Sequence, residues 1–263
     1  MEYGDTIKVP YSIEAKIFKM RQNNQYKKLS SKELKEISNK FNLKPKLIQS
    51  LIVAHLRNAN IINMARVKKN IKKIKSQYTK NEKSFEELAK EYKVSPLSIL
   101  RAILRPKKIS LKDQHKLSDK EMSEVKRADS IDSIEHIDQL RIKHKATEFE
   151  EVIGKILTKN KSTYYTEQDL RQQAVSHAAS HATSHATSHA TPDFLLKHKI
   201  TINGRRVAWV EVKNYYGANT KFIKRNIKKQ IDRYTKKWGD GCLVFRYGVS
   251  ESLHFDKTLI ISF

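Results

Sequence analysis

The fold of the C-terminal part of this chain is decided by residues 191–213, which read TPDFLLKHKITINGRRVAWVEVK. Two apolar, strand-like runs meet there at Asn203-Gly204, a dipeptide typical of the tight turn of a β-hairpin. The stretch therefore predicts two antiparallel strands joined by a short turn.

The second run of this hairpin carries charge on an otherwise apolar strand. Side chains alternate between the two faces of a strand, so Glu211 and Lys213 share one face while Val210 and Val212 point into the core. A carboxylate and an ammonium group on such a strand are costly to bury. Their presence indicates a functional site.

The register of the hairpin decides whether Asp193 joins that face. A two-residue turn at Asn203-Gly204 pairs Asp193 with Asn214, counting back along both strands, and leaves it facing away from Glu211. A three-residue loop with a left-handed glycine pairs Asp193 with Lys213 instead and brings both carboxylates to one face. We therefore predict a glycine bulge at Gly204 or an offset elsewhere in the hairpin.

Asp193, Glu211 and Lys213 together suit phosphodiester hydrolysis. Two carboxylates hold a hard divalent cation such as Mg²⁺ or Mn²⁺, which polarises a phosphate and lowers the pKa of a bound water. The lysine stabilises the negative charge that develops on the phosphate or orients the attacking water. The sequence therefore predicts a metal-dependent nuclease with these three catalytic residues, of which Asp193 and Glu211 bind the metal.

Residues 221–238 predict an amphipathic helix whose buried side carries Ile223, Ile227, Ile231, Tyr234 and Trp238. Eight Lys and Arg and a single Asp occupy the rest of that helix. Such a surface suits a phosphate backbone, and a solvated helix face is the alternative. The expected nucleic-acid-binding residues are Lys221, Lys224, Arg225, Lys228 and Lys229. With a helix at 148–157 before the hairpin and strands at 243–247 and 258–263 after it, the class expected is α+β.

Charge and cysteine content limit the partners and the compartment. The chain has 53 Lys and Arg against 28 Asp and Glu, a net charge of +25 that indicates a polyanion such as DNA. A compositional bias toward Lys is the alternative. The single Cys242 excludes an internal disulfide and fits a reducing compartment. Without a membrane span or a secretory segment, we expect an intracellular protein, in the nucleus, the cytoplasm or both.

Three domains are expected along the chain. Residues 1–106 form a helical region in which 31–57 and 84–104 resemble helix-turn-helix units, and residues 107–143 are polar enough to form a linker with a connecting helix. Residues 144–263 form the catalytic domain. Helix-turn-helix units read DNA grooves in many proteins, but helical hairpins of this size also serve only as packing units.

Residues 176–191 are a low-complexity insertion in the catalytic domain. His177, His181, His185 and His189 recur every four residues, a spacing that on a helix would form a stripe able to bind zinc or nickel. An expanded repeat in a surface loop is the favoured interpretation, because no carboxylate within the repeat orients the imidazoles.

Asp193, the run Glu211-Val212-Lys213 and an upstream helical glutamate resemble the PD-(D/E)xK, or restriction-endonuclease-like, nuclease superfamily, whose core runs helix, three strands, helix, strand (αβββαβ). Five blocks within residues 144–263 also resemble the codanin-interacting nuclease family: EFEEVIGKIL, TEQDLR, TPDFLL, VAWVEVKNYYG and QIDRYTKKWGDGCLVFRYG. That family likewise carries helix-turn-helix segments in its N-terminal half.

The resemblance implies further site residues. Glu150 would be the helical carboxylate, with Glu148 as the fallback, and the Val212 carbonyl would be a third metal ligand. Gln230 would join the site through a Q-x-x-x-Y element that ends at Tyr234. The resemblance also implies a codanin-like protein partner. Two alternatives to a nuclease remain: a catalytically silent adaptor for such a partner, and a helix-turn-helix DNA-binding protein supported by its C-terminal domain.

Overall fold

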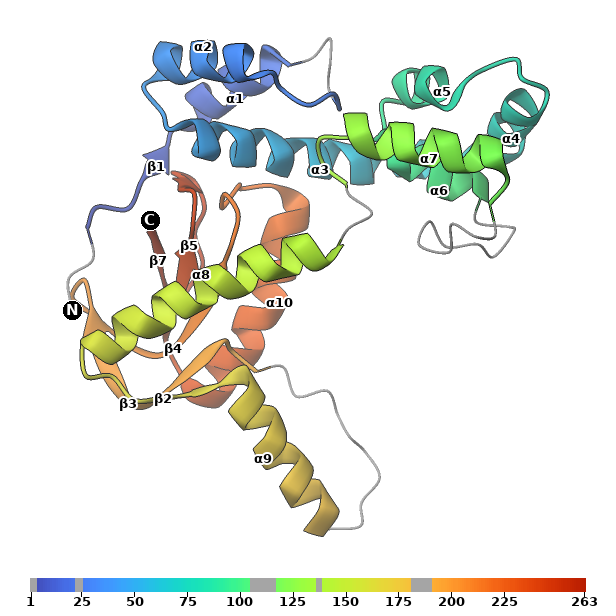
Figure 1. Cartoon of the computed structure of the whole chain (residues 1–263). Helices are drawn as coiled ribbons and strands as arrows, with labels where there is room; N and C mark the ends of the chain where they lie inside the picture. The colour runs from blue at the N-terminus through green and yellow to red at the C-terminus, as the bar shows by residue number, and fades with distance from the viewer. Residues whose placement is uncertain (1–3, 22–25, 105–116, 136–138, 181–190) are drawn as a thin grey trace. The chain divides into compact units, whose positions relative to one another are not determined.

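The computed structural model describes residues 4–21, 26–104, 117–135, 139–180 and 191–263 (Figure 1). The chain divides into two compact units, one formed by Ser12–Leu140 and the other by Met1–Tyr11 together with Arg141–Phe263. Helices and a mixed five-stranded sheet make the protein α+β, as the sequence predicts. Within the described residues, no helix combines the length and the apolar character needed to cross a bilayer.

The first unit is entirely helical where it is described. Its helices are α1 (Tyr11–Lys19), α2 (Ser31–Phe41), α3 (Pro45–Lys69), α4 (Ile71–Thr79), α5 (Phe85–Tyr92), α6 (Pro96–Leu104) and α7 (Asp119–Ile131). Three of them begin with a capping box, in which a serine and a glutamate three residues later bond each other's backbone amide groups. These local signals explain why the sequence marks the starts of α2 and α5.

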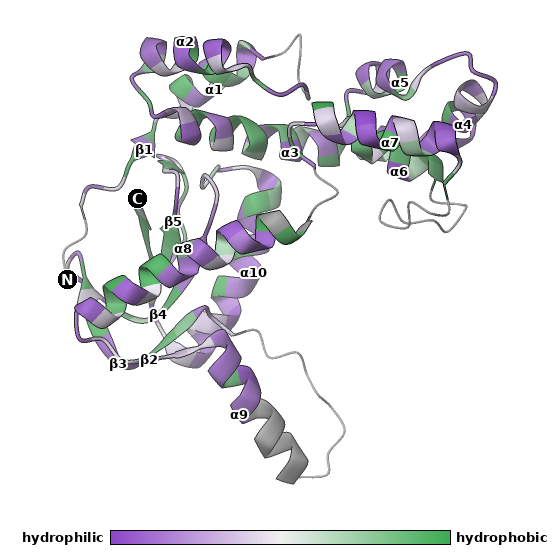
Figure 2. Ribbon diagram, viewed as in Figure 1, coloured by the Kyte–Doolittle hydropathy of each residue, from purple (hydrophilic) through white to green (hydrophobic). Residues whose placement is uncertain are grey.

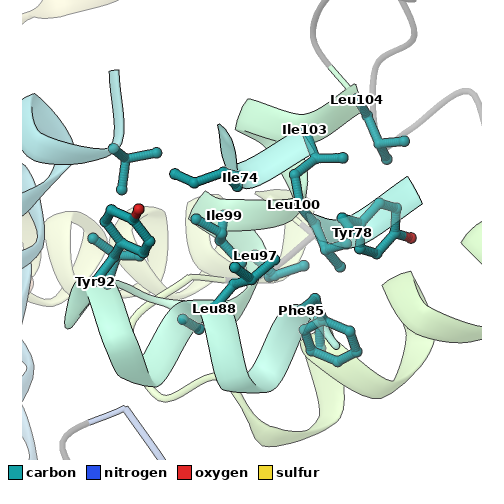
Figure 3. Close-up of a cluster of buried hydrophobic side chains, with 14 of the residues drawn as sticks. Ile74, Tyr78, Phe85, Leu88, Tyr92, Leu97, Ile99, Leu100, Ile103 and Leu104 are labelled. Atoms are coloured by element: carbon teal, nitrogen blue, oxygen red, sulfur yellow. The ribbon is translucent and has the colours of Figure 1, made fainter. Parts of the chain in front are cut away.

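Helix α6 lies at the centre of the core of this unit. Figure 3 shows Leu97, Ile99 and Leu100 of α6 gathered with Leu88 of α5 and Tyr78 of α4. A helix that reads a DNA groove needs a free face. Since α6 is buried along nearly its whole length, its burial favours the packing-unit interpretation of residues 84–104, and DNA reading by this pair stays a prediction.

The expected linker at residues 107–143 contains a core helix. Val125 and Ala128 of α7 are fully buried in the same cluster as α6. Asp132, which follows α7, is also buried and accepts hydrogen bonds from Ser95 Oγ (2.5 Å) and from the backbone amide of Leu97 (3.1 Å). The segment was expected to be a linker because it has few apolar side chains. Helix α7 is held to the core by those few and by the hydrogen bonds of Asp132.

The second unit contains the sheet. Its elements are β1 (Lys8–Val9), α8 (Gln139–Lys159), β2 (Tyr164–Thr166), α9 (Glu167–Ser180), β3 (Phe194–Ile202), β4 (Arg205–Lys213), α10 (Lys221–Trp238), β5 (Gly241–Phe245), β6 (Val249–Ser250) and β7 (Thr258–Ser262). The main sheet has the order β2-β3-β4-β5-β7. Its first two pairings are antiparallel and its last two are parallel.

Two helices cover opposite faces of this sheet. Phe149, Ile153 and Leu157 of α8 pack with Val210 and Val212 on one face. On the other face the cluster joins Ile227, Ile231 and Tyr234 of α10 with Trp209, Leu243 and Phe245 of the sheet. Figure 2 shows green, hydrophobic stretches along the central strands and mixed colouring along both helices. The alternation along β4 is the one predicted.

The N-terminal residues belong to the second unit. Strand β1 pairs in parallel with β6, and the amide of Val249 donates to the Ile7 carbonyl at 3.0 Å. Residues 1–106 were expected to form the helical region, whereas Met1–Tyr11 belong to the unit that contains the sheet. A strand of two residues is too short to show a period in the sequence.

Candidate active site

The turn between β3 and β4 contains two residues. Asn203 and Gly204 have φ values of 44° and 78°, and Ile202 pairs with Arg205 across the turn. Positive φ at both positions is the signature of a tight hairpin turn that matches the twist of the strands. The alternative with a glycine bulge at Gly204 is therefore wrong.

The offset lies inside the hairpin. Leu195 pairs with Trp209 while Ile200 pairs with Val207, so four residues of β3 stand opposite the single Ala208 of β4. The excess of three residues is odd, and an odd offset transfers the preceding part of a strand to the other face. Continued by two residues, this register sets Asp193 opposite Glu211, which confirms the second alternative.

Direct contacts join Asp193 to the end of β4. Its amide donates to Glu211 Oε2 at 3.3 Å, and its own Oδ2 accepts from the backbone amide of Val212 at 2.6 Å. Glu211 is only 4% exposed. The two carboxylates therefore lie together on the face that α10 covers.

The electrostatics of Asp193 reflect this crowding. Burial, followed by the negative charge of Glu211, raises the pKa of Asp193 well above its ordinary value, and the bond from Val212 offsets only part of that rise. Two carboxyl groups that share a desolvated site resist ionising together. Asp193 therefore keeps its proton to a higher pH than an exposed aspartate does.

Lys213 bridges the carboxylates and α10. Its Nζ donates to Glu211 Oε1 at 2.5 Å and to Gln230 Oε1 at 3.1 Å. Burial is the largest single influence and lowers the pKa of Lys213, but the charges of Glu211, Tyr215 and Asp193 and the bond to Glu211 together outweigh it, so the pKa lies above its ordinary value. The lysine is therefore an ammonium ion held in one place, and the structure brings Gln230 to the site as expected.

Tyr234 also contacts the site, although it was not among the expected site residues. Its hydroxyl donates to the Thr191 carbonyl at 2.8 Å, two residues before Asp193, and its ring packs edge-on against Trp209. Burial and the charges of Glu211 and Asp193 raise the pKa of Tyr234, so its hydroxyl stays protonated and remains a donor. The Q-x-x-x-Y spacing was the available signal, because it puts Gln230 and Tyr234 on adjacent turns.

Helix α8 offers two glutamates, and only one of them interacts with the site. Burial, then the charges of Glu167 and Glu211, raises the pKa of the half-buried Glu150. Glu148 is exposed, and its Oε1 lies 3.3 Å from Nδ1 of His144 on the same helix. The electrostatic influence of Glu211 and Glu167 on Glu150, and the exposure of Glu148, thus favour Glu150 over its fallback.

Glu167 is an acidic neighbour that sequence reasoning missed. Thr166 of β2 pairs with Phe194 of β3, so the next residue, Glu167, falls beside Asp193 when that register is continued. Thr191 Oγ1 donates to Glu167 Oε1 at 3.4 Å. The available signal was the Thr166-x-x-Asp169 cap, which marks a helix start directly after a short strand.

The residues present fit a hard divalent cation. In the described part of the chain, no group of three His, Cys, Asp or Glu side chains stands ready to hold a metal. A site here would combine the carboxylates of Asp193 and Glu211 with the Val212 carbonyl and with water or phosphate oxygens. All of these are the oxygen donors that Mg²⁺ and Mn²⁺ prefer. Burial and the charge of Glu211 disfavour the ionised form of Asp193, and a cation bound beside it would favour that form.

The predicted nucleic-acid-binding residues lie on the surface. Lys221, Lys224, Arg225, Lys228 and Lys229 are exposed along α10 and take no part in the contacts among Asp193, Glu211 and Lys213 described above. Of the histidine repeat, His181, His185 and His189 lie outside the described residues, and His177 falls within the span of α9.

A protein-family model described as "Protein of unknown function TPD sequence-motif" matches residues 114–262. The tripeptide Thr-Pro-Asp occurs once in the chain, at Thr191–Asp193. The chain is also 36% identical over 74 residues to the uncharacterized protein L539 of Acanthamoeba polyphaga mimivirus. That similarity covers 27% of this chain and 27% of the viral protein, so the chain spans about a quarter of the relative it matches. No solved structure matches the chain.

Proposed function

Because the family model for the TPD sequence motif matches more than half of the chain, the chain belongs to that family of unknown function, and we propose that it is a metal-dependent nuclease acting on DNA. The observation that carries the proposal is the meeting of Asp193, Glu211 and Lys213 on one face of β3 and β4. The proposal includes the restriction-endonuclease-like core that the sequence resembles, since α8, the antiparallel strands β2, β3 and β4, the crossover helix α10 and the parallel strand β5 follow in that order, with α9 inserted between β2 and β3.

Each residue would have a separate role. Asp193, Glu211 and the Val212 carbonyl would hold Mg²⁺ or Mn²⁺, which supplies Lewis acidity and a more acidic water when bound. Lys213 keeps a positive charge beside the site, where it stabilises the negative charge that builds on a phosphate during attack. Gln230 and Glu211 hold that ammonium group between them, so little reorganisation is needed when the charge develops.

Glu150 is suited to proton transfer. Its pKa is raised by burial and by the acidic residues beside it, so it holds a proton at a higher pH than an exposed glutamate does. A group of this kind can exchange a proton with water or with a departing oxygen.

The test is cleavage of labelled DNA by the full chain, with duplex and single-stranded substrates and with Mg²⁺, Mn²⁺ or EDTA. Wild type should cut only with metal, and Asp193→Asn and Lys213→Met should each lose at least about 100-fold in rate, as removing one charge-stabilising group typically does. Asp256→Asn is the matched control, because the Asp256 side chain is 97% exposed. Cutting that survives both site substitutions would overturn the assignment of the site.

The competing proposal is a silent adaptor that docks a codanin-like protein. An adaptor needs the fold but has no use for a buried lysine clamped between Glu211 and Gln230, which argues for the enzyme. A chain that binds such a partner yet cuts no substrate with either metal would favour the adaptor.

A further inference from the structure

Helix α10 has cations on both of its flanks, but the site touches only one flank. Gln230 bonds Lys213 of β4, and the Tyr234 hydroxyl bonds the Thr191 carbonyl just before β3. Both contacts lie on the side of α10 that faces β3 and β4. The opposite flank therefore faces the β5 side of the sheet.

Helical geometry sorts the basic residues between these flanks. Successive residues are about 100° apart, so Gln230 lies about 60° to one side of the buried Ile227. Lys229, Arg233 and Lys237 follow one another at intervals of four and lie on the Gln230 side of the helix. Lys221, Lys224 and Lys228 lie on the other side. Three of the five cations expected to bind nucleic acid, Lys221, Lys224 and Lys228, are thus on the far flank. Arg225 and Lys229 lie about 20° to either side of the outermost point, and Lys229 is the one on the site side.

The two flanks also differ in charge. Lys228 is paired with Asp232 at 2.8 Å, which neutralises part of the far flank. Among the described residues, no ion pair joins Lys229, Arg233 or Lys237 to an acidic side chain. Instead Arg233 Nε donates to the Lys229 carbonyl at 3.0 Å, which sets its guanidinium group along the row. The site flank therefore keeps its positive charge.

The bulge in β3 extends this row. Four residues of β3 stand opposite one residue of β4, and three of the four, Lys197, His198 and Lys199, are exposed. Lys199 Nζ reaches the C-terminal end of α10, where it would lie 3.7 Å from a Cβ built on Gly239. The same offset that turns Asp193 toward the site thus also carries a lysine to the end of the basic row.

We propose that a DNA backbone is bound by a basic ridge consisting of Lys229, Arg233, Lys237 and Lys199, and not by the far flank of α10. The inference rests on the proposed nuclease function, since it names the surface that would hold the substrate beside the site. Phosphates contacted by such side chains give affinity that falls with salt and is largely independent of base sequence.

Binding of a fluorescent duplex, measured by anisotropy across a range of KCl concentrations, tests the ridge. The full chain carrying Asp193→Asn is used without metal, so that catalysis plays no part. Two triple variants are compared, each removing three cations from α10: Lys229→Gln, Arg233→Gln and Lys237→Gln for the ridge, and Lys221→Gln, Lys224→Gln and Lys228→Gln for the far flank. Circular dichroism establishes that both remain folded.

The ridge variant should weaken binding at least about 10-fold and flatten the slope of log affinity against log salt by about 2 to 3, at about 0.9 for each lost phosphate contact. The far-flank variant should change affinity by less than about 3-fold, because its side chains face away from the bound strand. Equal losses, or a larger loss from the far flank, would overturn the ridge. Failure of the nuclease proposal looks different: wild type would cut nothing, whatever the binding data show.

Discussion

The Tyr234 hydroxyl donates to the Thr191 carbonyl at 2.8 Å and so fastens α10 to the chain two residues before Asp193. The bond links the helix that supplies Gln230 to the strand that supplies a carboxylate. The relative placement of Asp193 and Lys213 therefore depends on a contact made outside the proposed catalytic residues.

Tyr234→Phe removes only that hydroxyl and keeps the ring against Trp209. Loss of one hydrogen bond should lower the free energy of unfolding by about 1 kcal/mol. The cleavage rate should fall by more than this stability loss explains, because Asp193 loses its support. Urea unfolding and single-turnover cleavage measure the two effects, and Tyr11→Phe, at a side chain 68% exposed, is the control. An unchanged rate would mean that Asp193 needs no such anchor.

Metal should stabilise the protein more strongly as pH rises. The pKa of Asp193 is raised in the folded state by burial and by Glu211. Its contribution to stability is therefore complete below the unfolded aspartate value of about 3.9 and is lost as pH rises through the higher folded value. A cation binds the ionised form and reverses this loss. Thermal melting from pH 5 to 8.5, with and without Mn²⁺, should show a metal-induced shift that grows with pH.

The matched variant for the pH experiment is Asp193→Asn, which cannot ionise and should show a smaller and flatter shift. A metal effect that is the same at every pH in wild type, or that survives unchanged in the asparagine variant, would show that Mn²⁺ binds elsewhere.

Glu150→Gln should reduce cleavage by about 100- to 10,000-fold, the range expected when a group that exchanges protons is lost. Glu148→Gln should leave the rate within about 2-fold, because that side chain is exposed and pairs with His144 on the same helix. The rates are measured at saturating metal. If the two variants have equal cleavage rates, Glu150 has no role in cleavage that Glu148 lacks.

Glu167→Gln should lower the pKa of Glu150, since the charge of Glu167 helps to raise it. In the pH–rate profile, the limb that reports the ionisation of Glu150 should therefore lie at lower pH in the variant than in wild type. Glu251→Gln, at an exposed position directly after β6, serves as the control. If the profile does not move, the charge of Glu167 does not affect the pKa of the reacting groups.

Gly241→Ala should destabilise the sheet. A Cβ at that position would meet the Trp209 ring at 2.0 Å, and the ring is held in place by the bond from its Nε1 to the Gly239 carbonyl. Overpacking of this kind costs about 1 to 3 kcal/mol, measurable by urea unfolding. Gly4→Ala is the control, because nothing lies within 4 Å of its added Cβ. Equal stability of the two variants would contradict the packing described here.

Several features could be predicted from the sequence because they depend on neighbours within a few residues. The alternation that sends Glu211 and Lys213 to one face of β4 and Val210 to the other is one of them. The apolar spacing that bounds α10 at Lys221 and Trp238 is another. The order of the side chains shows directly whether apolar residues repeat every two residues, as in a strand, or every 3.6 residues, as in a helix.

Other features were decided only by the tertiary structure. The placement of Asp193 depends on where β3 absorbs its extra residues, and the turn at Gly204 does not reveal that position. Glu167 meets the site through a second strand pairing, and the flank of α10 that matters is set by its contacts with Lys213 and Thr191. The physical reason is that local periods determine which way each side chain points on its own element. The register and the docking of elements distant in sequence depend on packing summed over the whole core.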